Sequence, residues 1–179
     1  LTATGQAVTL SSQGAVLDGD TGTDDVDITA TSLTVTATGL GSASNTLEVA
    51  LDTLTATVGT GGVYLLETNA LLVSALTSGG AVSLSTQGGS GQNLSIASLT
   101  AIGQAVTLSS QGAVLDGDTG SDNVDITAAS VAVTAASVGN SADSLDTDVA
   151  SLSGVLGTGG LHLANAGALQ IPSLASSRS

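Results

Sequence analysis

The chain has 179 residues, with 15 acidic residues, one basic side chain and a formal net charge of −14. The near absence of Lys and Arg argues against a nucleic-acid partner and against an anionic membrane surface, because nothing could neutralise the phosphates. The lack of Cys excludes a disulfide scaffold and thiolate metal sites.

Short segments in which apolar and polar residues alternate recur along the chain. The first is "AVTL" at residues 7–10, and others follow at 26–29, 32–37, 47–51, 54–58, 63–66, 81–85 and 94–96. A period of two indicates β-strands with one buried face. Gly, Ser, Asn and Asp separate the segments, as turns require, and helical spacing is not sustained anywhere. The sequence therefore predicts an all-β protein.

The core must be built from small side chains. Tyr64 is the one aromatic residue, and Phe, Trp and Met are absent. Val, Leu, Ile and Ala fill a narrow cross-section, in which like residues can stack. No stretch of eighteen consecutive apolar residues occurs, so direct membrane insertion is not expected. The first residues also lack the basic and apolar regions of a signal peptide.

The phrase "GQAVTLSSQGAVLDGDTG" begins at Gly5 and again at Gly103, an offset of 98 residues. This offset aligns residues 1–81 with residues 99–179 without gaps. Residues 1–98 are therefore interpreted as a first long repeat and residues 99–179 as a second, truncated one, within one continuous solenoid. The final residues 177–179, which include the only Arg, are expected to belong to a cloning scar.

Strand starts divide the long repeat into about five coils. They fall at Ala7, Val26, Leu47, Val63, Ala81 and Ala105, in steps of 16 to 24 residues. Coils of about 20 residues predict a single-stranded parallel β-helix, or β-solenoid, in which strands lie about 4.8 Å apart. A β-sandwich is the weaker alternative, because its hairpins use Asn-Gly or Asp-Gly turns, which are scarce here.

The stretch from Gly39 onward carries a recognisable motif. The positions that match it are Gly39, Gly41, Ser42, Asn45, Leu47, Glu48, Leu54, Ala56, Gly61, Gly62, Val63, Tyr64, Glu67, Ala70 and Leu71. The motif resembles a module of filamentous-haemagglutinin-like giant bacterial adhesins and autotransporter-type proteins. Thr46 departs from it, because the family often has Pro there. The resemblance implies a right-handed β-helical stalk in a secreted or cell-surface protein, and it brings no catalytic residues.

Two acidic segments, residues 17–27 and 115–125, carry the most chemistry in the chain. Carboxylates at close spacing on a Gly-containing loop can converge on Ca²⁺. The candidate ligands are Asp18, Asp20, Asp24, Asp25, Asp27, Asp116, Asp118, Asp122 and Asp125. The pattern matches neither the EF-hand nor the calcium-binding nonapeptide repeat. Asp27 lies between Val26 and Ile28 and is expected to point outward, so a solvated acidic loop is the simpler interpretation.

Other chemistry is less well supported. Thr-x-Thr runs at residues 31–39 and 53–60 suggest an ice-binding face, but the variable coil lengths are expected to put them out of register. The single histidine, His162, aligns with Tyr64 and is expected at the surface, without the partners of a catalytic triad. A polysaccharide-cleaving enzyme would need basic residues or aromatic platforms that are lacking, so no enzyme is expected.

Together these features predict a structural repeat in the stalk of a large secreted or cell-surface bacterial adhesin, where it acts as a spacer. The alternative is a binding module that uses the acidic loops for calcium or a Thr/Ser face for glycans. The expected partners are neighbouring repeats of a longer chain. Terminal coils without caps also predict end-to-end self-association, because open strand edges invite pairing.

Overall fold

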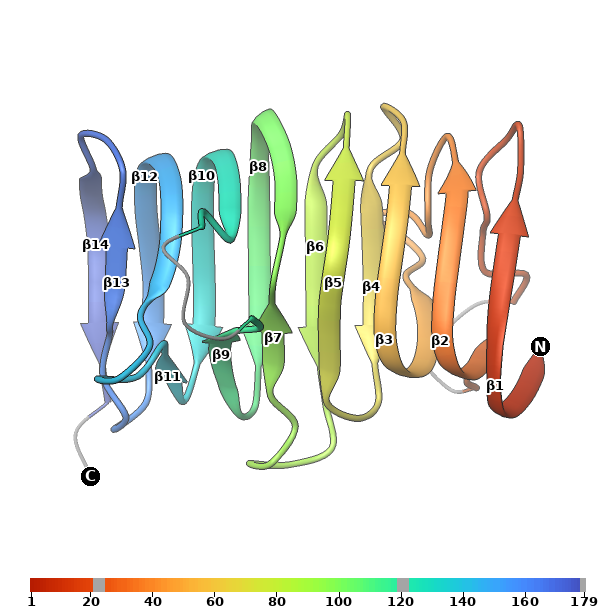
Figure 1. Cartoon of the computed structure of the whole chain (residues 1–179), viewed down its shortest axis with the longest axis horizontal. Helices are drawn as coiled ribbons and strands as arrows, with labels where there is room; N and C mark the ends of the chain where they lie inside the picture. The colour runs from red at the N-terminus through yellow and green to blue at the C-terminus, as the bar shows by residue number, and fades with distance from the viewer. Residues whose placement is uncertain (21–24, 119–122, 178–179) are drawn as a thin grey trace.

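The computed structural model describes residues 1–20, 25–118 and 123–177 of the chain. Within this part every regular element is a β-strand, and the strands form one sheet that winds along the molecule (Figure 1). The strands are β1 (Thr2–Ser11), β2 (Ile28–Ala37), β3 (Leu47–Val58), β4 (Val63–Glu67), β5 (Leu71–Ser78), β6 (Val82–Thr86), β7 (Leu94–Ile96), β8 (Leu99–Ser110), β9 (Ala113–Asp116), β10 (Ile126–Ala135), β11 (Ser137–Val138), β12 (Leu145–Leu156), β13 (Leu163–Asn165) and β14 (Gln170–Ser176).

The pairings between these strands are all parallel, and the strands inside the stack pair with strands of the coils before and after them. The result is a β-solenoid of about eight turns with about 21 residues per turn. Backbone donors and acceptors of one coil are satisfied by its neighbours, so no tight hairpin is needed between strands. The prediction of an all-β solenoid with coils of about 20 residues is confirmed.

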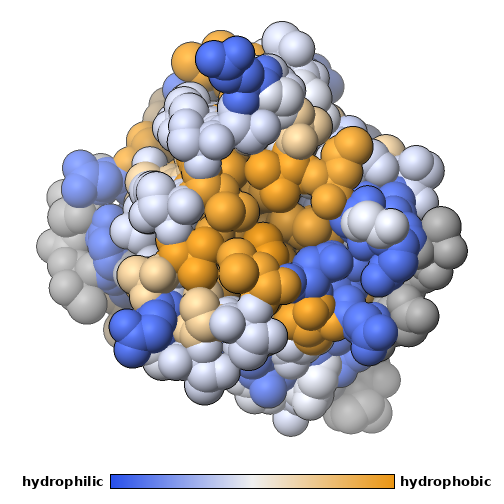
Figure 2. Space-filling view, turned by 90° about the vertical axis from the view of Figure 1, so that its right-hand side faces the viewer, coloured by the Kyte–Doolittle hydropathy of each residue, from blue (hydrophilic) through white to orange (hydrophobic). Residues whose placement is uncertain are grey.

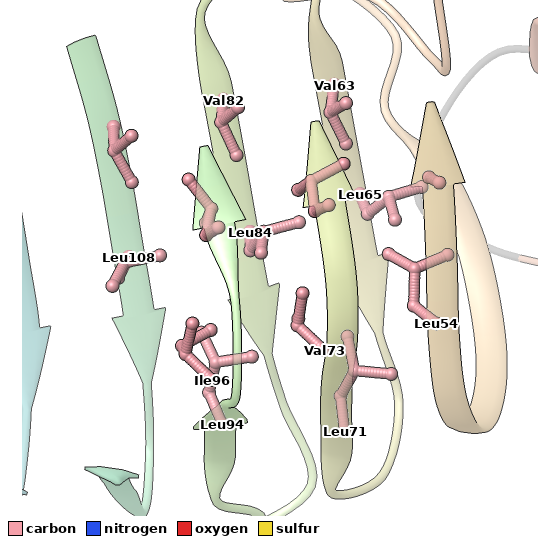
Figure 3. Close-up of a cluster of buried hydrophobic side chains, with 14 of the residues drawn as sticks. Leu54, Val63, Leu65, Leu71, Val73, Val82, Leu84, Leu94, Ile96 and Leu108 are labelled. Carbon is pink, nitrogen blue, oxygen red and sulfur yellow. The ribbon is translucent and has the colours of Figure 1, made fainter. Parts of the chain in front are cut away.

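Inward-facing Leu, Val and Ile side chains stack in ladders along the axis (Figure 3). Leu65, Leu84 and Leu108 follow one another on β4, β6 and β8, and each is 1% exposed. A second ladder runs through the fully buried side chains Leu54, Val73 and Ile96 on β3, β5 and β7. Because the ladders consist of aliphatic side chains of similar size, a narrow core closes without large aromatic residues.

Among the strands of the first repeat, β5 has no counterpart in the segments predicted from alternation. Leu71, Val73 and Leu76 face the core, so the spacing changes from two residues to three. The register against β3 shifts at the same place, after the pair Leu54 and Val73. An extra residue in the strand therefore breaks the period of two on which the prediction depended.

A glycine turn before β3 shows how closely neighbouring coils approach. Gly41 has φ +67°, and a Cβ there would collide with the carbonyl oxygen of Tyr64 and lie 2.9 Å from the Leu47 nitrogen. The equivalent Gly139 has φ +58° and meets the same crowding in the second copy. Only glycine suits this turn, because it tolerates positive φ and adds no side chain.

The 98-residue repeat does not return to the same side of the solenoid. Val8 lies in the ladder that continues through Leu33 and Leu54. Its equivalent Val106 lies in a different ladder, the one that contains Val82. At about 21 residues per turn, 98 residues make about four and two-thirds turns rather than five whole coils. Equivalent residues of the two copies therefore face different directions.

The N-terminal end of the stack exposes part of the core. Val8 and Leu10 of β1 are only partly buried, whereas their equivalents in the middle of the stack, Val106 and Leu108, are each 1% exposed. Figure 2 looks onto this end and shows apolar residues at its centre inside a polar rim. At the other end Leu174 of β14 is 40% exposed. Neither terminal coil is covered within the described chain.

Candidate metal centre

Two groups of three carboxylates lie where an acidic loop meets the strands. One group contains Asp116, Asp118 and Asp125, and the other contains Asp18, Asp27 and Glu48. Within each group, one carboxylate oxygen from every residue lies within 4.8 Å of the others. Because 98 residues separate Asp18 from Asp116 and Asp27 from Asp125, the two clusters share two equivalent positions and differ in the third member.

We call the group of Asp18, Asp27 and Glu48 the first cluster and the group of Asp116, Asp118 and Asp125 the second cluster. In the second cluster, backbone hydrogen bonds hold Asp125 just before β10. Its nitrogen donates to the Asp146 carbonyl oxygen (2.8 Å), and its Oδ2 accepts from the Asp146 nitrogen (2.7 Å). Its carbonyl oxygen accepts from the Leu99 nitrogen (2.6 Å). Asp116 ends β9, and its Oδ1 accepts from the Asp118 nitrogen (2.9 Å) across a tight turn. These bonds fix the Asp125 and Asp116 side chains, and the turn brings Asp118 beside them.

The first cluster repeats this arrangement. Asp27 donates from its nitrogen to the Glu48 carbonyl oxygen (2.8 Å) and accepts from the Glu48 nitrogen on Oδ2 (3.1 Å). Asp18 Oδ1 accepts from the Asp20 nitrogen (2.9 Å). Thr46 Oγ1 donates to Glu48 Oε1 (2.9 Å), and the Leu1 amino group donates to the Asp27 carbonyl oxygen. The loop is therefore bonded in the same way in both copies.

The orientation predicted for this segment is wrong. Val26 is 39% exposed and Val124 is 40% exposed, whereas Asp27 is half-buried and Asp125 is fully buried. The reason is that β2 and β10 begin only at Ile28 and Ile126. The preceding residues bend, and each aspartate turns back to accept a backbone N–H of the next coil.

Each cluster contains one buried oxygen without a hydrogen-bond partner. Asp125 Oδ1 is such an atom, in a side chain that is 0% exposed, and Asp18 Oδ2 is the other. Buried polar atoms in folded proteins are nearly always paired, because leaving one without a partner loses the hydration that it had in water. These two oxygens therefore have free capacity to accept a ligand.

The carboxylates of each cluster also repel one another. Two unit charges 4.8 Å apart repel by about 3 kcal/mol at an effective dielectric constant of about 20. Burial raises the pKa of Asp125 to about 7; the Asp146 N–H bond opposes this rise, and the charges of Asp116 and Asp118 add to it. Burial likewise raises the pKa of Asp116 and of Glu48. No Lys or Arg occurs among the described residues to offset these charges.

The nine predicted ligands divide as follows. Asp18, Asp27, Asp116, Asp118 and Asp125 fall in the two clusters. Asp20 lies beside the first cluster, where its carbonyl oxygen accepts from Asn45 Nδ2 (2.8 Å), and Asp25 is exposed outside both clusters. Asp24 and Asp122 lie outside the described residues.

Sequence reasoning missed Glu48, because it lies 21 residues after Asp27 and outside the acidic loop. That separation is about one turn of the solenoid. A search for carboxylates one turn after each aspartate of the loop would therefore have found Glu48. Asp146 is the equivalent residue of the second copy.

A third buried carboxylate, Glu67, lies at a corner of the solenoid away from both clusters. It is 1% exposed and ends β4. Leu51 donates its N–H to both carboxylate oxygens (3.1 and 3.0 Å), and Thr68 and Asn69 donate theirs to Oε1 (2.9 and 3.2 Å). The Asn69 side-chain nitrogen also donates to Oε1 in the orientation that satisfies both polar atoms of its amide. The Glu67 side chain thus accepts the N–H of Leu51 at the corner where the pairing of β3 changes from β4 to β5.

In the second copy, an uncharged side chain makes the hydrogen bonds at the equivalent corner. Asn165 is the equivalent of Glu67, and its Oδ1 accepts from the Val149 nitrogen (3.0 Å). Its Nδ2 donates to the carbonyl oxygens of Val149 (3.2 Å) and Gly167 (3.1 Å). Burial raises the pKa of Glu67 to about 8, although the N–H groups of Leu51, Asn69 and Thr68 oppose that rise. The corner therefore requires a hydrogen-bonding side chain rather than a charge.

Threonines form an outward ladder along one side of the stack, in contrast to the predicted lack of register. Thr36, Thr57, Thr77, Thr100 and Thr127 are successive partners on β2, β3, β5, β8 and β10. The prediction failed because the differences in coil length fall in loops and bulges, while the paired strands are in register at these threonines. A second column is shorter: Thr34 pairs with Thr55, and Ala75 follows. His162 is exposed, as expected.

Comparisons of the chain with protein-family models, curated proteins and solved structures return no match. Within the described residues, no helix has the length and apolar character needed to cross a membrane. The features that bear on function are therefore the stacked fold, the two acidic clusters and the open ends. Of these, the acidic clusters are the ones with metal-ligand chemistry, since hard cations prefer carboxylate oxygens.

Proposed function

We propose that the chain is a structural segment of the stalk of a large secreted or cell-surface bacterial adhesin, in which it acts as an extended spacer. The observation that carries the proposal is the uninterrupted stack of about eight parallel coils with both ends open. At about 4.8 Å per coil, such a stack spans roughly 40 Å. Each further 98-residue repeat would add roughly 22 Å along the same axis.

A spacer role also fits the chemistry of the surface. The outward residues are mostly Ser, Thr, Asn, Asp and Gly, and the net charge of −14 disfavours contact between like molecules. A solenoid gains stability from contacts between neighbouring repeats, so its length can change without redesign of the core. The resemblance of the motif at residues 39–71 to filamentous-haemagglutinin-like adhesins also supports a position between a cell surface and a distal domain.

The proposal is tested by display on a bacterial surface. The chain, in one, two or three copies, is inserted between an outer-membrane anchor and an epitope tag. Binding of a bulky antibody to the tag should rise with each added copy. Flexible Gly/Ser linkers with the same numbers of residues serve as the control. The end-to-end distance of such a disordered linker grows only with the square root of its length. Equal antibody binding for the solenoid and linker series would contradict the spacer role.

The alternative function, a binding module, is distinguished by a glycan array with the isolated chain. Specific glycan capture that is lost when Thr36, Thr57 and Thr77 are replaced by Ala would favour the binding module. A chain that binds no glycan but extends the reach of the tag would support the spacer.

A further inference from the structure

We propose that Asp116, Asp118 and Asp125 form a Ca²⁺ site on the side of the solenoid where β9 meets the start of β10. Their carboxylate oxygens already lie within 4.8 Å of one another. Calcium binds oxygen ligands at about 2.3–2.6 Å, so one ion can bridge oxygens up to about 5 Å apart. The three residues can therefore bind one ion without a change in the backbone. This proposal does not depend on the spacer role.

The observation that points to a ligand is the state of the Asp125 side chain. It is 0% exposed, and its Oδ1 has no hydrogen-bond partner although Oδ2 accepts from the Asp146 nitrogen. A solvated acidic loop would leave this carboxylate in water, where both oxygens are hydrated. A bound cation would coordinate the buried Asp125 Oδ1, which has no hydrogen-bond partner. Its positive charge would also offset the repulsion of Asp125 by Asp116 and Asp118.

Coordination by three aspartates leaves positions open for further oxygen ligands. Asp146 is half-buried at the start of the adjacent strand β12 and its charge acts on Asp125, so its carboxylate is a candidate for a further ligand. Water would complete the six to eight oxygen ligands that Ca²⁺ takes.

The site is tested by isothermal titration of the full chain with CaCl₂ at constant ionic strength, together with thermal unfolding. Asp125→Asn keeps the size and the Oδ acceptor but removes the charge. This variant should lose one equivalent of Ca²⁺, or bind it at least tenfold more weakly, and should lose the rise in Tm that Ca²⁺ gives the unmodified chain. Without calcium its Tm should equal or exceed that of the unmodified chain, because a repulsive buried charge is gone.

Asp148→Asn is the matched control, because it removes the same charge from an exposed position outside the cluster. Its calcium stoichiometry and affinity should match those of the unmodified chain. Unchanged stoichiometry and affinity in Asp125→Asn, or no calcium binding by the unmodified chain at millimolar concentration, would overturn the proposal. Equal rises in Tm with Ca²⁺ and Mg²⁺ would overturn it too, because they would indicate general screening of charge.

Discussion

Replacing Glu67 with Gln should remove much of the pH dependence of the chain's stability. Burial raises the pKa of Glu67 to about 8, from 4.5 for an exposed glutamate. Between these values the folded chain holds a proton that the unfolded chain has released. The free energy of unfolding should therefore be highest near pH 4.5 and fall as the pH rises toward 8.

The size of the effect follows from linkage. One proton difference changes the free energy of unfolding by about 1.4 kcal/mol per pH unit, so Glu67 contributes a loss of roughly 3.5 kcal/mol between pH 5 and pH 8. Gln keeps an oxygen that can accept the N–H of Leu51, and it has no charge to desolvate. Asn165 already holds the equivalent corner with an amide, so the variant is expected to fold.

The assay is urea unfolding followed by circular dichroism at intervals from pH 5 to pH 8. The difference in slope between the unmodified chain and Glu67→Gln isolates Glu67, since Asp125, Asp116 and Glu48 act in both proteins with the same sign. Asp148→Asn is the control, because it removes an exposed carboxylate whose charge is not among those that act on Glu67. Identical slopes for the unmodified chain and Glu67→Gln would refute the reasoning, and would mean that the N–H groups keep the carboxylate ionised.

Three further predictions concern packing, the glycine turn and the ends. Leu84→Ala should lower the free energy of unfolding, measured in urea, by about 3 kcal/mol because it leaves a cavity in the buried ladder. Leu174→Ala at the exposed end should lower it by less than about 1 kcal/mol. Equal losses for the two variants would contradict the role of the buried ladder in stability. Gly41→Ala should lower Tm by several degrees, and Gly91→Ala, whose Cβ meets nothing within 4 Å, should hardly change it. Light scattering should show a monomer at low salt and end-to-end oligomers at high salt, since salt screens repulsion over about 10 Å at 0.1 M; a monomer at every salt concentration would show that the ends do not pair.

The alternation of apolar and polar residues predicted most of the strands because each strand has one buried face. It predicted β4, β6 and β7 almost residue for residue, and it divided β3 into two segments at a corner that the structure spans with one strand. It failed at β5, where an extra residue changes the spacing, and at Val26, which precedes its strand. Local patterns reveal which face of a strand is buried, but they do not show where a bulge or a bend interrupts it.

The acidic clusters could be predicted in part, for a different physical reason. Asp18 and Asp27 belong to one loop, so their proximity follows from sequence distance. Glu48 joins them because stacking brings residues about one coil length apart together, and coil length varies along the chain. The buried state of Asp125 depends on the bend before β10, which no residue pattern marks. Two members of the first cluster were therefore predictable, and the third required the register.

The mismatch between repeat length and coil length determines how the acidic clusters are presented. At about four and two-thirds turns per 98 residues, the two clusters lie roughly 22 Å apart along the axis, on different sides of the solenoid. This separation exceeds the screening length of about 10 Å at 0.1 M salt, so ions at the two clusters should bind without influencing each other. Three repeats would make about fourteen whole turns, and the fourth cluster would return to the side of the first. A stalk of such repeats would therefore carry its carboxylates in a slow spiral, which keeps like charges apart while the apolar ladders stay continuous.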